Sequence, residues 1–341
     1  MRNEKLEIRN NMTKRQLILI ALLVVSVLGF AQQLHTRFDI RIPAKNTYLE
    51  QAQNVLLVNN SAIQPLTLGH PVFVEDKLIG NDTINLADAP RHMLLSMAQT
   101  LEESELFETV SVLERPINKN LSFYQRAVPT QTQLDSLMRE YDADALVILG
   151  RLASFNKKEQ LYDNDGNCKY LSAFQNTQWT VYHKVQTHNF LFADSLYWEE
   201  CKTDGTEPYI PDVKTALLDM SAYTGDLIAK TFVPQWETVD RYLYENDNKD
   251  LQAGLNHLKH YSLEEAIESF TAAQTTKNKL TKAYAVANLA VVLELKGEPK
   301  QAREQAEKAV SLFIKLKSAW GRQQAINQQV YVNELKTIYR L

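Results

Sequence analysis

The sequence predicts a mixed α/β domain followed by an all-α domain of helical repeats, behind an apolar N-terminal segment. Three observations support this architecture. Short aliphatic runs typical of strands alternate with helical patterns between residues 54 and 244. Two stretches of the C-terminal third match one another at a constant spacing, and residues 17–31 are almost all apolar. The expected domains are therefore 1–31, 32–245 and 246–341.

The composition is that of an ordinary folded protein, with 45% hydrophobic and 23% charged residues in a chain of 341. A formal net charge of -4 at pH 7 gives no reason to expect nucleic acid as a partner. The chain contains no glycine-rich phosphate-binding loop and no H-E-x-x-H or G-x-S-x-G motif. We therefore expect no cofactor and no enzymatic activity.

The N-terminal apolar run, residues 17–31, follows two basic residues at 14–15. It is shorter than the roughly 20 residues of a membrane span and suits the apolar region of a signal peptide. Gly29 and Ala31 place small residues where a signal peptidase would cut before Gln32. We expect an exported protein, periplasmic or in the cell envelope, that touches the membrane only through this segment if it stays uncleaved. The cysteine of a bacterial lipoprotein signal is missing here, so no lipid anchor is expected.

The α/β domain is expected to alternate strands with helices and to end in a hairpin, a helix and a last strand. The expected strands are 54–59, 107–113, 145–152, 178–186, 189–198 and 236–244, and the expected helices are 88–103, 130–141 and 212–231. The polar residues Thr187, His188 and Asn189 are the expected turn of the hairpin. Alternating strands and helices favour parallel pairing, and the hairpin adds antiparallel strands, so the sheet should be mixed.

Three segments resemble the periplasmic domains of the CsgG and TolB N-terminal type. They are VLLVNNS at 55–61, SELFETVSVLER at 104–115 and DADALVILGRL at 142–152. The resemblance implies an α/β domain in which strands and helices alternate.

Other pieces resemble an uncharacterised Bacteroidetes cell-envelope family that joins such a domain to tetratricopeptide helices. They are FDIRIPAKNTYL at 38–49, W-x-V-Y at 179–182, SLYWEE at 195–200 and P-x-W-x-x-V-x-R at 234–241. This resemblance implies an architecture and a compartment, and no chemistry.

The C-terminal repeat is visible in small and bulky residues that recur 36 residues apart. The matched pairs are Gly254/Ala290, Ala266/Ala302, Phe270/Ala306 and Ala273/Ala309. This spacing is close to the roughly 34-residue period of tetratricopeptide repeats, in which a small residue lets two helices cross closely. A further helix is expected at 318–338, covering the open end of the array.

Stacked helix pairs form a concave surface that can hold a peptide or another protein. Tyr284, Asn288, Val291 and Leu295 follow one stripe of the first helix in the second repeat. We expect them to form the partner-binding groove, with Tyr284 and Asn288 as the exposed contacts. Val291 and Leu295 suit core packing equally well.

The two cysteines, Cys168 and Cys201, lie at the same end of the expected hairpin. In an oxidising compartment they could form a disulfide, and two free thiols are the alternative. His257 and His260 lie one helical turn apart without a third ligand nearby, so no metal site is expected. Residues 163–167 (DNDGN) suit a tight turn better than a calcium loop, because the glycine comes too early.

These features predict a non-enzymatic adaptor of the cell envelope that binds a protein or peptide partner through its helical repeat. The alternative is a carbohydrate- or peptide-processing enzyme with its site at the aromatic hairpin. Asp194, Glu199 and Glu200 would then have to supply a pair of carboxylates roughly 5–10 Å apart. Glu199 and Glu200 are adjacent in a strand and should point to opposite faces, which disfavours them as that pair.

Overall fold

The structure is a computed structural model and describes residues 32–117, 122–125, 128–163, 166–183 and 186–341. The expected signal or anchor segment, residues 1–31, lies outside the described residues. Contacts divide the chain into two compact units. An α/β unit consists of residues 43–235, and a helical unit contains residues 236–341 together with the N-terminal strand.

This division differs from the expected domains 32–245 and 246–341. Strands β1 (Gln32–Ile42) and β9 (Gln235–Glu245) pair with each other in a two-stranded sheet of their own. The side chain of Thr238 donates a hydrogen bond to Asp39 at 2.6 Å across this ribbon. Two segments about two hundred residues apart in sequence therefore join the helices as one body.

In its described residues, the α/β unit contains seven strands in one sheet and three helices. The strands are β2 (Asn54–Asn59), β3 (Pro71–Val74), β4 (Lys77–Asn81), β5 (Thr109–Leu113), β6 (Ala145–Asp163), β7 (Gly166–His183) and β8 (Gln186–Lys202), and the helices are α2 (Ala89–Glu103), α3 (Gln131–Glu140) and α4 (Val213–Phe232). Strand β2 pairs in parallel with β5 and β6, whereas β6, β7 and β8 form an antiparallel meander. The expected mixed sheet is confirmed.

Local sequence signals explain where the three helices begin. Thr130 forms a reciprocal capping box with Gln133 at the start of α3, and the Asp212 carboxylate accepts the backbone N–H of Thr215 at the start of α4. Asp88 precedes α2 without a side-chain cap bond, and a proline follows in the first turn. Each helix therefore begins where its capping residue predicts.

Strands β6, β7 and β8 are longer than expected, and the residues expected to form the hairpin turn lie inside a strand. Strand β7 ends at His183 and β8 begins at Gln186, so Thr187, His188 and Asn189 lie inside β8. Strand β6 continues to Asp163, and β7 begins at Gly166 with a φ of 112°. Residues 153–163 and 166–177, between the expected strands, belong to β6 and β7, because one face of each strand is buried while the other meets water.

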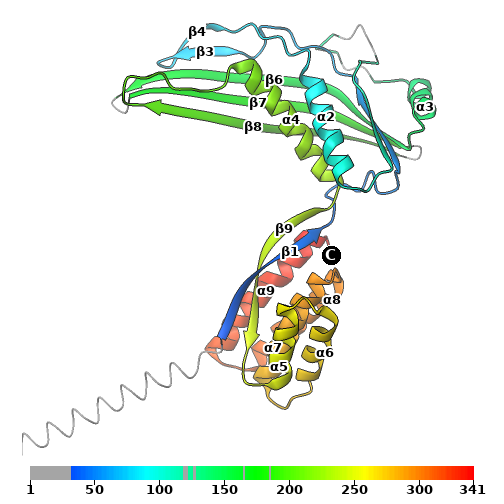
Figure 1. Cartoon of the computed structure of the whole chain (residues 1–341), viewed down its shortest axis with the longest axis vertical. Helices are drawn as coiled ribbons and strands as arrows, with labels where there is room; N and C mark the ends of the chain where they lie inside the picture. The colour runs from blue at the N-terminus through cyan, green and yellow to red at the C-terminus, as the bar shows by residue number, and fades with distance from the viewer. Residues whose placement is uncertain (1–31, 118–121, 126–127, 164–165, 184–185) are drawn as a thin grey trace, which may run out of the picture. The chain divides into compact units, whose positions relative to one another are not determined.

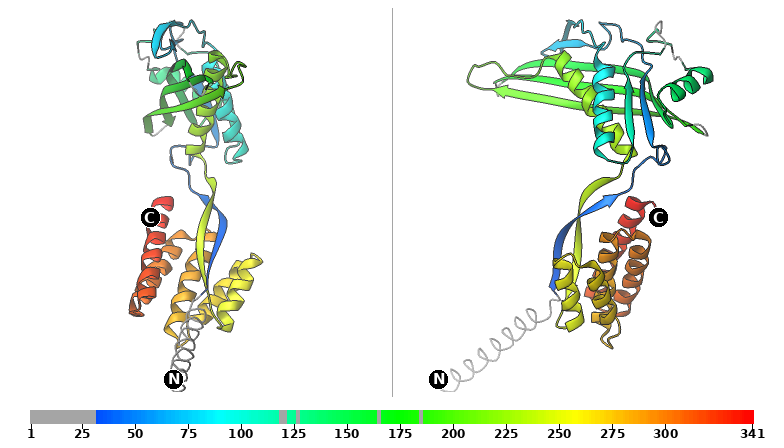
Figure 2. Two further views of the ribbon diagram at one scale, coloured as in Figure 1. Left: turned by 90° about the vertical axis from the view of Figure 1, so that its left-hand side faces the viewer. Right: turned by 45° about the vertical axis from the view of Figure 1, so that its right-hand side comes forward.

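The sheet has two differently covered faces. Helices α2 and α4 run side by side on one face of the sheet, where α2 contacts β2 and β5, and α4 contacts β6, β7 and β8 (Figures 1 and 2). They bury Leu57, Val147 and Trp179 there, and a side chain at Gly225 of α4 would collide with the backbone of α2. Among the described residues, α3 is the one helix on the other face, where it packs on Leu56. Much of that face has no helix in the described part of the chain.

The helical unit contains α5 (Lys249–Lys259), α6 (Leu263–Ala273), α7 (Lys279–Leu295), α8 (Pro299–Lys315) and α9 (Ala319–Tyr339). The matched small residues lie where helices touch. A Cβ atom at Gly254 would come within 2.5 Å of the Phe270 ring, and Ala290 and Ala302 are fully buried. Within the described part of the chain, no helix is long and apolar enough to span a membrane.

Strand β9 is anchored to α7 by two buried polar contacts. The Asn288 side chain accepts the backbone N–H of Tyr244 and donates to its carbonyl, both at 2.8 Å. The Arg241 guanidinium donates to both carboxylate oxygens of Glu294 at 2.7 Å, and this pair is almost completely buried. Because the Asn288 side chain replaces a strand neighbour for Tyr244, β9 is held in an extended conformation against a helix.

The contact between Asn288 and β9 should dominate the stability of the helical unit. Replacing Asn288 with alanine leaves the Tyr244 N–H and carbonyl unpaired in the core, so we expect the free energy of unfolding to fall by about 2–4 kcal/mol. Denaturant unfolding of the purified protein measures this. The exposed Asn333 of α9 is the matched control, and Asn333→Ala should change stability by less than about 0.5 kcal/mol. Equal effects of the two changes would contradict this interpretation.

Burial should also make the helical unit sensitive to alkali. Burial raises the pKa of the Tyr244 phenol from 10.0 to about 12. The contribution of the buried, protonated phenol to folding stability is fully present below pH 10. It is lost as pH rises from 10 to 12, because the unfolded chain then releases the phenol proton while the folded chain retains it. We expect this tyrosine to remove about 2–3 kcal/mol of stability over that range. Denaturant titrations between pH 9 and 12 should show a shallower decline for Tyr244→Phe, and an unchanged slope would contradict the assignment.

Candidate functional site

The expected partner-binding groove on α7 is not an open surface. Tyr284 and Asn288 are 0% exposed and Val291 is 1% exposed, while Leu295 is half-buried. The expectation that Tyr284 and Asn288 make exposed contacts is therefore wrong. The reason is that the β1–β9 ribbon packs on this stripe, with the Tyr244 ring stacked on Tyr284 at 5.0 Å between centroids.

A cavity of about 390 Å³ lies on the sparsely covered face of the α/β sheet. Four segments line it: 123–125, 150–151, 178–179 and 189–191. The last three belong to neighbouring strands β6, β7 and β8, and the first belongs to the connection between β5 and α3. A second cavity of about 360 Å³ shares Gly150, Gln178 and Asn189 with it and extends toward α3. Both volumes are in the usual range of ligand pockets.

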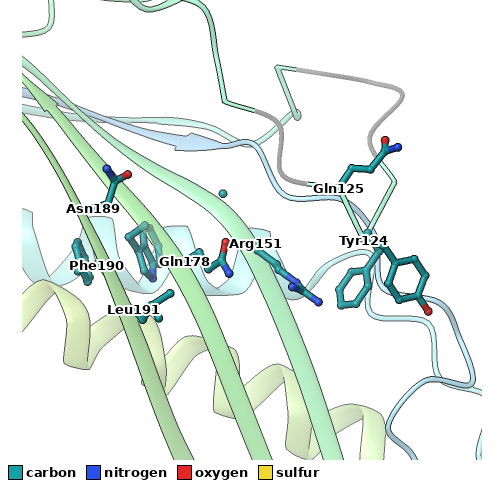
Figure 3. Close-up of a pocket in the computed structure, with 10 residues that line it drawn as sticks. Tyr124, Gln125, Arg151, Gln178, Asn189, Phe190 and Leu191 are labelled. Carbon is teal, nitrogen blue, oxygen red and sulfur yellow. The ribbon is translucent and has the colours of Figure 1, made fainter.

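A β-bulge positions the central residues of the first cavity. Leu149 is opposite Trp179 and Arg151 is opposite Gln178, so Gly150 is an extra residue without a partner in β7. The bulge reverses which side chains of β6 face the helices. Leu149 points to the α2 and α4 face, and Arg151 points to the open face beside Gln178 (Figure 3). Glycine at this place also keeps the strand backbone accessible from the cavity.

Arg151 has no counter-ion in the part of the chain that the structure describes. Among the described residues its side chain makes no ion pair and no hydrogen bond, and its Nε atom is buried without a partner. The guanidinium lies over the Phe123 ring at 4.6 Å from the centroid. Figure 3 shows it extending from β6 toward the segment that carries Tyr124. Arg151 is half-buried, and buried N–H donors such as its Nε are normally paired, so this guanidinium is available to an anion from outside.

The rest of the lining is made of amides and apolar side chains. Gln178 and Gln125 contribute amide groups, and Asn189 accepts a hydrogen bond from Thr180 at 2.7 Å. Leu191 is 76% exposed and Tyr124 is 70% exposed at the rim. No described residue of this lining is acidic. The arrangement can therefore bind an anion at Arg151 and hydrogen-bond polar groups attached to it.

The carboxylates of the alternative enzyme site do not converge. Glu199 and Glu200 lie on opposite faces of β8, and Glu200 accepts bonds from Lys202 and from the backbone of Tyr209. The bond from Lys202 lowers the pKa of Glu200, while the Glu199 carboxylate accepts the Tyr197 hydroxyl. Asp194 lies six residues from Glu200, roughly 20 Å along the strand. None of these three lines the cavity at Arg151.

Cys168 and Cys201 are directly opposite each other in β7 and β8, with a Cα–Cα distance of 4.1 Å, and they form a disulfide. Of the two arrangements considered from the sequence, the structure has the bonded one. His257 and His260 belong to no group of three potential metal ligands in the described part of the chain. The His260 Nδ1 atom is 2.8 Å from the Asn256 carbonyl instead.

The sequence pattern predicts residues 145–152 as one strand and does not single out Arg151 or its cavity. The signal that could have been used is Gly150, because a glycine inside an aliphatic strand often marks a bulge or a close approach of a ligand. The surrounding loop at 123–125 comes from elsewhere in the sequence, so its proximity to Arg151 is a tertiary feature.

If Arg151 binds a ligand and does not stabilise the fold, removing its charge should not lower the free energy of unfolding. Arg151→Met retains an unbranched stem on Phe123, and we expect the free energy of unfolding to stay constant or rise by up to about 2 kcal/mol. Arg91→Met, at an exposed arginine paired with Glu114, is the control and should change little. Denaturant unfolding would reject the idea if Arg151→Met lost more than about 1 kcal/mol, the size of a cation–π contact.

Comparisons with known proteins give two family matches. Residues 52–244 match a domain of unknown function, DUF8603, and residues 253–337 match a second, DUF6340. No curated protein matches the sequence. A crystal structure of an uncharacterized protein is similar at 11% identity, covering 52% of this chain and 91% of that chain with a TM-score of 0.27. The first match spans more than half of the 341 residues, and the chain therefore belongs to the DUF8603 family.

Proposed function

We propose that the chain is a non-enzymatic adaptor of the cell envelope that binds a protein or peptide partner. The binding site is the cavity around Arg151 in the α/β unit, in place of the helical groove expected from sequence. The observation that carries this proposal is the buried Nε of Arg151, which has no partner among the described residues and lies in a cavity lined by amides and apolar groups. A binding site explains an unpaired guanidinium, because the partner supplies the missing anion.

Other features support the architectural part of the proposal. The pairs α5–α6 and α7–α8 carry small residues at matched contact positions, which supports tetratricopeptide-like repeats. The order of β2, α2, β5, α3 and β6 supports a domain of the CsgG and TolB N-terminal type. The disulfide supports an exported location, because such bonds persist in oxidising compartments.

The helical unit has a structural role in this proposal. Its groove on α7 already holds an extended strand, β9, through Asn288 and Arg241. Because β9 already occupies this groove, we place the partner-binding site in the α/β unit. The repeats then serve to hold the two ends of the α/β unit, since β1 leads into that unit and β9 leaves it.

Site-specific photo-crosslinking in the native cell tests the function. A benzophenone side chain at Leu191, on the rim of the cavity, should give an adduct of one discrete mass. The same group at the exposed Ile314 of α8 should give none. The mature N-terminus, determined by mass spectrometry of the envelope fraction, should be Gln32.

Two outcomes would overturn the proposal. An adduct at Ile314 without one at Leu191 would move the binding surface to the helices. An intact chain in the cytosol, with no adduct at either position, would reject both the location and the adaptor role.

A further inference from the structure

We infer that the Arg151 cavity recognises a free carboxylate, namely the C-terminal carboxylate of a peptide. This inference rests on the proposed function and deepens it by naming the chemical group that is bound. It depends on the type, number and placement of the groups around Arg151.

The first argument is charge. Among the lining residues that the structure describes, Arg151 is the one cation, and no lining residue is acidic. A single guanidinium matches a ligand with a single negative charge. Its planar fork of donors matches the two oxygens of a carboxylate, and such paired bonds are roughly twice as strong as neutral ones. A phosphate group carries more charge and is usually bound by several cations or a helix N-terminus.

The second argument is the position of the polar neighbours. Gln178 is directly opposite Arg151 in β7, and its amide has no hydrogen bond to the residues that the structure describes. Gln125 lines the same cavity from the loop. An amide side chain can both donate and accept, so it suits the peptide groups that precede a C-terminal carboxylate. A simple inorganic anion has no group for these amides to bind.

The third argument is the shape of the cavity system. The second cavity shares Gly150, Gln178 and Asn189 with the first and adds Val128 and Leu134 as apolar lining. Arg151 and its ring partner Phe123 line the first cavity only. A carboxylate at Arg151 therefore leaves the second cavity for the side chain or the preceding residue of the same molecule. Two cavities of about 390 and 360 Å³ that share lining residues suit a peptide end better than a small acid alone.

The backbone of the bulge completes the site. Gly150 lines both cavities, and a Cβ atom there would meet nothing closer than the Gln178 carbonyl at 3.5 Å. A larger side chain at this position would project into the space between the two cavities. Gly150→Val should therefore weaken peptide binding without removing the charge of Arg151.

The test uses three small probes on the purified protein: N-acetyl-leucine, its neutral amide, and the free-acid tripeptide N-acetyl-Ala-Ala-Leu. Nuclear magnetic resonance follows the Nε–H signal of Arg151, which is assigned by its loss in Arg151→Lys. We expect both acids to shift this signal at millimolar concentration, and the amide to bind at least about tenfold more weakly. The tripeptide should bind more tightly than N-acetyl-leucine because it reaches the second cavity.

Variants separate the contributions of charge and shape. Arg151→Gln should abolish the preference for acid over amide, and Arg151→Lys should retain part of it because the charge remains without the fork. Gln178→Ala should weaken the tripeptide more than N-acetyl-leucine. Arg91→Gln, at the exposed arginine paired with Glu114, is the matched control and should bind as the unchanged protein does. Circular dichroism of each variant checks that it is folded.

Different outcomes would overturn the carboxylate and the peptide parts of the inference. Equal binding of acid and amide, or no shift of the Arg151 signal by either acid, would overturn the carboxylate inference. Equal affinity for N-acetyl-leucine and the tripeptide would reject the peptide and leave a small monocarboxylate as the ligand. In both cases a discrete crosslink at Leu191 would keep the adaptor function, so the two proposals fail separately.

Discussion

The α/β unit depends on one irregularity, the β-bulge at Gly150. Strand β6 is paired along both edges, with β2 and β3 on one side and β7 on the other. Without the extra residue, the alternation that turns Leu149 toward α2 and α4 would continue, and Leu152 would point away from the helices. The bulge instead keeps Leu149 and Leu152 in the same core and turns Arg151 to the open face. A single glycine thus permits a long buried strand and a charged cavity at the same place.

The helical unit depends on a side chain that satisfies the backbone hydrogen-bonding groups of a strand. Strand β9 has a neighbour in β1, yet the Tyr244 backbone pairs with the Asn288 side chain. The buried ion pair between Arg241 and Glu294 lies further along the same ribbon and helix. Buried pairs of this kind contribute little net stability but are costly to break, so they define one register between strand and helix. The ribbon is therefore an integral part of the helical core.

The two units differ in how completely their polar groups are used. In the helical unit, Asn288 and Arg241 have partners within the chain, and the surface they might have offered is closed. In the α/β unit, Arg151 and Gln178 face a cavity with their hydrogen-bonding capacity unused among the described residues. Because a buried N–H donor without a partner is unfavourable, the placement of the Arg151 Nε atom is better explained by a ligand than by folding. This contrast is the physical basis for placing the binding site in the α/β unit.

Local sequence patterns determined the helices and the strands that alternate with them, but they did not predict β1, β3 or β4. Apolar periodicity predicted the helices, and in the structure Thr130 and Asp212 cap two of them, because these signals act within a few residues. The recurrence of Gly254 and Ala290 predicted where helices pack closely. Tertiary structure alone decided which faces of the helices and of the sheet are exposed, since the periodicity of a sequence does not show which other segment covers a face. Asn288 is buried by a strand that precedes its helix, and Arg151 meets a loop before its own strand, so both outcomes depend on contacts between segments distant in sequence.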